Sequence, residues 1–123
     1  MSEPLFLGVD GGGTRCRARL ETKDGRVLGS GLSGPASMRF GFEASRESIM
    51  AATRQALAEA GLTESDLAQT YAGIGLAGSG LTGARAALES WQHPFARAWF
   101  EGDGYLAWLG AFGGDEAGVV VCG

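Results

Sequence analysis

The sequence predicts an α/β fold in which helices pack on a single mixed β-sheet. Three features predict it. The chain opens with residues that alternate in the manner of strands, a long stretch with the helical period follows, and short apolar runs then alternate with short helical segments. The length of 123 residues suits one domain with its own hydrophobic core.

Three strands at the start of the chain are predicted to form an antiparallel meander. Residues 5–9 form a short apolar run, and residues 15–20 alternate between arginines and apolar side chains. The pair Asp24-Gly25 is typical of a hairpin turn, after which residues 26–31 return as the third strand.

The rest of the chain is predicted to alternate between helices and strands. A helix over residues 42–60 has one apolar stripe and stops before Gly61, a residue that favours helix C-termini. The later elements are a turn of helix at 63–67, a strand at 71–77, a helix at 84–91, a strand at 96–101, a helix at 105–112 and a strand at 119–122. Because the last strand is followed at once by the final residue, we expect the chain to be a piece of a longer protein.

The composition narrows the functional classes. The net charge of −4 weighs against a nucleic-acid-binding protein or a protein bound to an anionic membrane. No apolar run approaches the roughly 20 residues of a membrane span, and from residues 1–4 we expect no secretory signal. Cys16 and Cys122 lie far apart in the sequence, which indicates reduced thiols in a cytoplasmic protein.

The strongest chemical motif is Gly8-Val9-Asp10-Gly11-Gly12-Gly13-Thr14. A carboxylate ends a predicted buried strand, and three glycines allow the backbone N–H groups of the following turn to approach a phosphate. A carboxylate beside phosphates implies a cation, and Mg²⁺ is the usual one. The alternative is a glycine-rich hairpin with a solvated aspartate. The motif is not a Walker A loop, because the Gly-Lys-Ser/Thr ending is missing.

A second glycine-rich motif runs from Gly78 through Ser79 to Gly83 after a predicted strand, with Glu101 about 20 residues further on. This arrangement is typical of a dinucleotide-binding turn. Against that hypothesis, the helix that follows is short, and the motif comes after the fourth strand rather than the first. The simpler interpretation is a glycine-rich connection.

The third motif places Asp103 just beyond the strand predicted at 96–101. In open α/β sheets ligands bind at the carboxyl ends of strands, so Asp103 is a candidate general base. It is equally suited to cap the helix that follows, and the two roles are compatible. Composition assigns no functional role to the loop residues Ser37 and Met38. We interpret the arginines of residues 15–20 as a solvated strand face.

Taken in order, these motifs resemble the sugar kinase, Hsp70 and actin superfamily, and within it the BadF/BadG-type branch that contains bacterial glucosamine kinase and N-acetylglucosamine kinase. The segments that carry the resemblance are Gly8 to Thr14, Cys16-Arg17-Ala18-Arg19, Gly34-Pro35-Ala36-Ser37, Gly73 to Gly78, His93-Pro94-Phe95 and Asp103-Gly104-Tyr105. The resemblance implies a ribonuclease H-like, actin-like ATPase domain with a mixed five-stranded sheet. It also implies that residues 1–116 form the N-terminal domain and that 117–123 begin a second ATPase domain.

The resemblance assigns roles to individual positions. Asp10 would hold Mg²⁺, and Gly11, Gly12, Gly13 and Thr14 would surround the phosphates of ATP. Asp103 would accept the proton of the attacking sugar hydroxyl. Ser37, Met38, Gly78, Ser79 and Asp103 would contact the sugar.

The implied activity is ATP-dependent phosphorylation of the 6-hydroxyl of an amino sugar, with glucosamine as the first expectation and N-acetylglucosamine as the alternative. The family usually has asparagine at the position of Ser37, which leaves this preference open. A homodimer is implied for the full-length protein, and this piece by itself is expected to have little or no activity. Three other functions remain as alternatives. They are an ATP-driven dehydratase activator, a nicotinamide-nucleotide-binding domain at 78–83, and a sugar sensor without catalysis.

Overall fold

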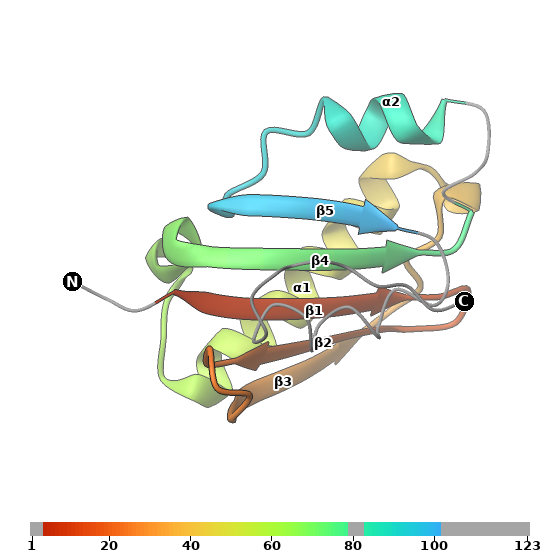
Figure 1. Cartoon of the computed structure of the whole chain (residues 1–123). Helices are drawn as coiled ribbons and strands as arrows, with labels where there is room; N and C mark the ends of the chain where they lie inside the picture. The colour runs from red at the N-terminus through yellow and green to blue at the C-terminus, as the bar shows by residue number, and fades with distance from the viewer. Residues whose placement is uncertain (1–3, 79–82, 102–123) are drawn as a thin grey trace.

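The structure, a computed structural model, describes residues 4–78 and 83–101 (Figure 1). Its elements, in chain order, are β1 (Leu5–Gly11), β2 (Cys16–Glu21), β3 (Val27–Ser33), the 3₁₀ turn η1 (Met38–Phe40), α1 (Phe42–Ala60), the 3₁₀ turn η2 (Glu64–Gln69), β4 (Thr70–Leu76), α2 (Ala84–Glu89) and β5 (Arg97–Glu101). The helix predicted at 105–112 and the strand predicted at 119–122 lie outside the described residues.

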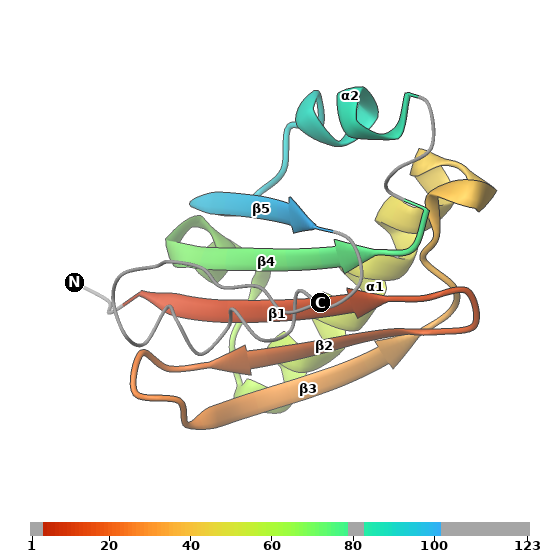
Figure 2. The same ribbon diagram turned by 45° about the vertical axis from the view of Figure 1, so that its right-hand side comes forward.

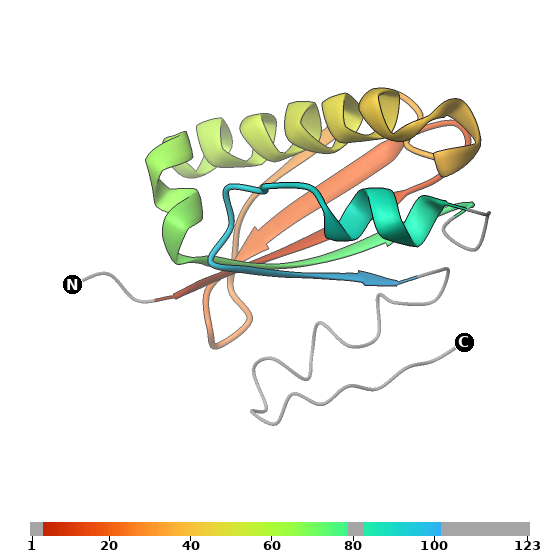
Figure 3. The same cartoon turned by 90° about the horizontal axis from the view of Figure 1, so that it is seen from above.

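The five strands form one mixed sheet in the order β3-β2-β1-β4-β5, which Figure 2 shows face-on. The first three strands pair antiparallel, whereas β1 pairs parallel with β4, and β4 pairs parallel with β5. Seen from above, α1 and α2 lie on the same side of this sheet (Figure 3). The predicted mixed sheet with an antiparallel N-terminal meander and helices packed on it is therefore confirmed.

The hydrophobic core lies between the sheet and α1. Alternate side chains of the central strands point into it, as the period of two predicts. They are fully or almost fully buried and comprise Leu7, Val9, Cys16, Ala18, Leu20, Ala72, Ile74 and Leu76, which face Ile49, Ala52, Ala56 and Leu57 of α1. Burial of each large aliphatic side chain stabilises the fold by about 1.5–3 kcal/mol.

Helix α1 begins and ends close to where the sequence predicted. Gly61 ends it in the left-handed conformation, with φ of 76°, and the Gly61 N–H donates to the carbonyls of the last turn.

The following turn, η2, begins after Thr63, whose N–H donates to the Asp66 carboxylate at 2.9 Å. The turn of helix predicted at 63–67 is present as this 3₁₀ turn, and the bond from Thr63 to Asp66 caps its start.

Two glycines of β3 let α1 approach the sheet closely. A Cβ atom on Gly31 would lie 2.2 Å from the Ala52 carbonyl oxygen, and one on Gly29 would lie 2.3 Å from the Ala56 carbonyl oxygen. Both distances are far below van der Waals contact. The helix backbone therefore packs directly on the strand backbone at these two positions.

The outer edge of β3 is closed by side chains of α1. The Ser30 N–H donates to Glu59 Oε1 at 2.8 Å, and the Leu32 N–H donates to Gln55 Oε1 at 3.0 Å. Gln55 Nε2 donates in return to the Leu32 carbonyl at 2.6 Å. These groups would otherwise be open to pairing with another strand, which is the usual hazard of a sheet edge.

We predict that the double substitution Gln55→Ala and Glu59→Ala opens this edge. The freed backbone groups and the half-exposed Leu32 side chain should then pair with a second molecule. Size-exclusion chromatography with light scattering should show a species of higher mass than wild type. Glu47→Ala, an exposed change on the same helix, is the matched control. An unchanged mass for the double variant at high concentration would contradict the prediction.

Candidate active site

Asp10 lies near the carboxyl end of β1 and is exposed, while its neighbours Val9 and Gly11 are buried. Strand alternation places Asp10 on the face of the sheet opposite to α1. No ion pair holds the Asp10 carboxylate within the part of the chain that the structure describes. The carboxylate is thus free to bind a cation.

Gly11 is required by packing at this point of the chain. A Cβ atom there would lie 2.7 Å from Leu76 Cδ2 and 2.8 Å from both Cβ and the carbonyl oxygen of Ala36. The absence of a side chain lets β1 continue through Asp10 to Gly11, two residues beyond the predicted strand end. The first glycine of the motif therefore sets the path of the hairpin.

The tip of the β1–β2 hairpin presents unused N–H donors. Gly12 N–H donates to the Arg15 carbonyl at 2.9 Å and closes the turn. Within residues 4–78 and 83–101, the N–H groups of Gly13 and Thr14 have no protein acceptor, and both residues are exposed. Two adjacent amides and the Thr14 hydroxyl are the kind of donor set that binds phosphate oxygens.

Backbone hydrogen bonds join this hairpin to two other segments. The Ala36 N–H donates to the Gly12 carbonyl at 2.9 Å, and the Ala77 N–H donates to the Gly11 carbonyl at 3.0 Å. The Ala77 carbonyl in turn accepts from the Met38 N–H at 2.9 Å. The hairpin, the start of η1 and the end of β4 are therefore one connected unit at the carboxyl ends of β1 and β4.

Three predicted sugar-contacting residues, Ser37, Met38 and Gly78, meet in this unit. The Ser37 side chain is 1% exposed, and its hydroxyl accepts from the Arg39 N–H at 3.2 Å, so it caps η1. Gly78 has φ of 78°, and a Cβ atom on it would lie 3.3 Å from Met38 N and Ser37 Oγ. The close approach explains a glycine at position 78. Ser79 and Asp103 lie outside the described residues.

Glu101, the residue proposed for the dinucleotide motif, ends β5. Its backbone pairs in register with Gly75 of β4, and Gly75 pairs in register with Asp10 of β1. The carboxyl ends of β1, β4 and β5 are therefore neighbours. Of the dinucleotide motif itself, residues 79–82 lie outside the described ranges, and α2, which follows, has six residues.

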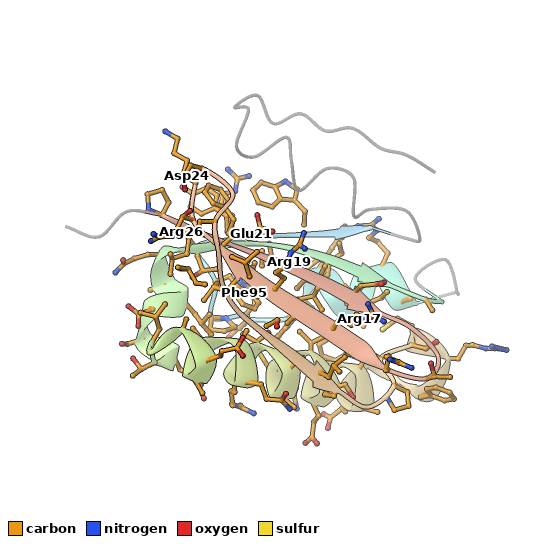
Figure 4. The ribbon with its side chains drawn as sticks, turned by 90° about the horizontal axis from the view of Figure 1, so that it is seen from below. Arg17, Arg19, Glu21, Asp24, Arg26 and Phe95 are labelled. Carbon is orange, nitrogen blue, oxygen red and sulfur yellow. The ribbon has the colours of Figure 1, made fainter. Side chains whose placement is uncertain are left out.

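Arg17 is a candidate that sequence reasoning missed. It stands directly opposite Asp10 in the β1–β2 pairing and is exposed on the same face. Figure 4 shows Arg17, Arg19 and Glu21 following one another along β2. Arg19 is paired with Glu21 at 2.8 Å, whereas Arg17 has no such pair among the described residues. The signal in the sequence was the alternation of 15–20, which placed the arginines on one face but could not place Asp10 beside them.

Cys16 is buried beneath the hairpin and does not belong to the open site. Burial raises the pKa of its thiol to about 11, against 9.0 for a free thiol, while a hydrogen bond with Ser33 opposes the shift and the Asp10 charge adds to it. The thiol is therefore protonated at neutral pH.

No cluster of three or more His, Cys, Asp or Glu side chains suited to a metal occurs in the part of the chain described.

The Cys16 pKa predicts a loss of stability at alkaline pH. The folded state favours the neutral thiol, so this stabilisation is complete below about pH 9 and declines as the pH rises toward about 11. Between about pH 8 and about pH 10.5, wild type should lose about 2 kcal/mol more unfolding free energy than Cys16→Ala. Urea titrations of both proteins measure the difference. Equal losses in the two proteins would contradict the prediction.

None of the helices in the described ranges combines the length and the apolar character that a membrane span requires.

Comparison with known proteins gives consistent results. The sequence profile of the BadF/BadG/BcrA/BcrD ATPase family matches residues 7–123. The glucosamine kinase GspK of Vibrio cholerae serotype O1 is 36% identical over 118 residues, which are 96% of this chain and 40% of GspK. A solved structure from Chromobacterium violaceum, provisionally assigned as an N-acetylglucosamine kinase, superposes with a TM-score of 0.77 at 33% identity. It is matched over 94% of this chain and 40% of its own length, so the chain spans about two fifths of each relative.

Proposed function

Because the chain belongs to the BadF/BadG/BcrA/BcrD ATPase family, we propose that it is the N-terminal lobe of an ATP-dependent amino-sugar kinase. The transferred phosphoryl group goes to the 6-hydroxyl of the sugar. Glucosamine is the first substrate to test and N-acetylglucosamine the second, since the two relatives carry those names. The expected sugar kinase fold, with its mixed five-stranded sheet, is shared with the solved relative.

The observation that carries this proposal is the arrangement around Asp10. The exposed Asp10 carboxylate stands one residue before the end of β1, and the next turn presents the N–H groups of Gly13 and Thr14; none of these groups has a partner among the residues that the structure describes. A carboxylate beside anion-binding amides is electrostatically consistent when a divalent cation lies between the carboxylate and the phosphates. Mg²⁺ typically uses one or two carboxylates together with phosphate oxygens and water, and the single Asp10 fits that pattern.

The residues of the chain then have distinct roles. Asp10 holds Mg²⁺ directly or through water, and the turn from Gly11 to Thr14 positions the phosphates of ATP. Arg17 adds positive charge on the same face of the sheet. Bound ATP would supply the phosphoryl group, and Mg²⁺ would neutralise the negative charge on its oxygens. Met38, Gly78 and Ser79 would contribute to the sugar side of the site, and Ser37, whose side chain is buried, would hold the turn that carries Met38.

Asp103 is proposed as the general base that takes the proton of the sugar hydroxyl. Asp103→Asn in the native gene product should reduce kcat by at least about 10²-fold and leave ATP affinity nearly unchanged. The steady-state kinetics of glucosamine phosphorylation measure both. Glu101→Gln, a nearby carboxylate change, is the control and should retain most activity. Normal turnover in Asp103→Asn would leave Asp103 with a helix-capping role alone.

The domain organisation is part of the proposal. Residues 1–116 form the N-terminal domain and 117–123 begin a C-terminal ATPase domain, which agrees with the share of the relatives that this chain covers. We place the protein in the cytoplasm as a homodimer. The intact mass of the native gene product, with the peptide that follows Gly123, tests this organisation. A native protein that ends at Gly123 would lack half of the proposed ATP site, and the kinase proposal would fail.

A further inference from the structure

We infer that Phe40 is the apolar platform for the sugar ring, an inference that rests on the proposed function. Phe40 is 57% exposed, the most exposed large apolar side chain in the described part of the protein. The other two, Val27 and Leu32, lie on the edge strand β3. An aromatic ring left in water forgoes the stabilisation of burial, so a ligand that packs on it gains that stabilisation.

The exposure of Phe40 does not come from a loose loop. Its N–H donates to the Ser37 carbonyl at 2.9 Å, and the Gly41 N–H donates to the Met38 carbonyl at 3.1 Å. The Ser37 hydroxyl, which accepts from the Arg39 N–H at 3.2 Å, caps the same turn. Every residue of this turn is therefore held by a hydrogen bond, and the ring is presented from a fixed backbone.

That backbone belongs to the unit that contains the phosphate hairpin. The turn is bonded to the end of β4 through Met38 N–H and the Ala77 carbonyl, at 2.9 Å. Its Arg39 nitrogen lies 3.2 Å from the position that a Cβ atom on Gly78 would take. Figure 1 shows this turn at the carboxyl end of β4. Phe40 is thus carried on a turn that is bonded directly to Ser37 and to the strand that ends before Gly78, both proposed for the sugar side of the site.

The chemistry of the ring suits an amino sugar. A pyranose has a face of C–H groups that packs on aromatic rings, and ligand pockets are lined largely by such side chains. The protonated amino group of glucosamine is also attracted to the face of a ring. In residues 4–78 and 83–101 the Phe40 ring has no aromatic or guanidinium contact, whereas Phe42 packs on Trp91 with ring centroids 5.9 Å apart. Of these two phenylalanines, it is therefore Phe40 whose ring can pack against a ligand.

The test is the kinetics of Phe40→Ala in the native gene product. Because the ring binds substrate and transition state alike, KM for glucosamine should rise about tenfold while kcat changes little. KM for ATP and the thermal unfolding temperature should stay at their wild-type values, since Phe40 is exposed. Phe40→Trp should retain a low KM. Leu32→Ala, which removes a side chain that is 50% exposed on β3, is the matched control and should change neither KM.

Two results would overturn the inference while leaving the kinase proposal in place. One is an unchanged glucosamine KM in Phe40→Ala. The other is a rise in both KM values with a lower unfolding temperature, which would show that Phe40 packs against another part of the protein. If wild type itself neither binds nor phosphorylates a hexosamine, the proposed function fails, and the role of Phe40 fails with it.

Discussion

Gly31→Ala should destabilise the domain by at least about 3 kcal/mol, a large part of the roughly 5–15 kcal/mol by which domains are stable. The new Cβ atom would lie 2.2 Å from the Ala52 carbonyl oxygen and 2.6 Å from Gln55 Cβ. The first of these contacts is with helix backbone, which cannot rotate away as a side-chain tip can. Either α1 moves off the sheet or β3 bends, and both changes open the core.

Urea unfolding followed by circular dichroism measures this effect. Gly34→Ala is the matched control, because a Cβ atom there would have Ser48 Oγ as its nearest neighbour at 3.9 Å. The control should keep the wild-type midpoint, whereas Gly31→Ala should unfold at much lower urea or fail to fold. Coincident unfolding curves for Gly31→Ala and wild type would show that α1 does not pack on β3 in this way.

Asp10→Asn should reduce the kinase activity of the native gene product by roughly 10³-fold, since metal-ion stabilisation of transition-state charge is worth several kcal/mol. The amide keeps the shape of the carboxylate but removes the charge that holds Mg²⁺. Asp10 is exposed and has no ion pair among the described residues, so thermal stability should not fall. The Mg²⁺ concentration that gives half-maximal activity should rise as well.

Asp24→Asn is the control for Asp10→Asn, because it makes the same chemical change at the opposite end of β2. There the Thr22 hydroxyl donates to the Asp24 carboxylate, and the amide oxygen of asparagine can still accept that hydrogen bond. The control should keep full activity. If Asp10→Asn were as active as the control, the hairpin would be structural only.

The sequence predicted the parts of the fold that local patterns specify. The helix over 42–60 followed from its apolar stripe and Gly61, and the meander followed from alternation and the Asp24-Gly25 turn. The strand order was not predictable in this way, because parallel pairing of β1 with β4 joins residues about 65 positions apart. The family resemblance implied a mixed five-stranded sheet, and the order of its strands comes from the structure.

The candidate site was predictable in its residue types and less so in its geometry. Asp10 and the glycines stood out because a carboxylate followed by three glycines is unusual. The packing role of Gly11 against Leu76, and the position of Arg17 beside Asp10, depend on contacts between distant segments. The capping role of the Ser37 hydroxyl and the exposure of Phe40 likewise required the three-dimensional structure.

The decisive measurement for the proposed kinase function is the identity of the product that the native gene product forms with ATP, Mg²⁺ and glucosamine. Phosphorus NMR and mass spectrometry of the sugar identify it. We expect glucosamine 6-phosphate and ADP in equal amounts, with product lost in Asp10→Asn. ATP hydrolysis without a sugar phosphate for any hexosamine, together with protein-bound iron, would contradict it and favour a dehydratase activator instead.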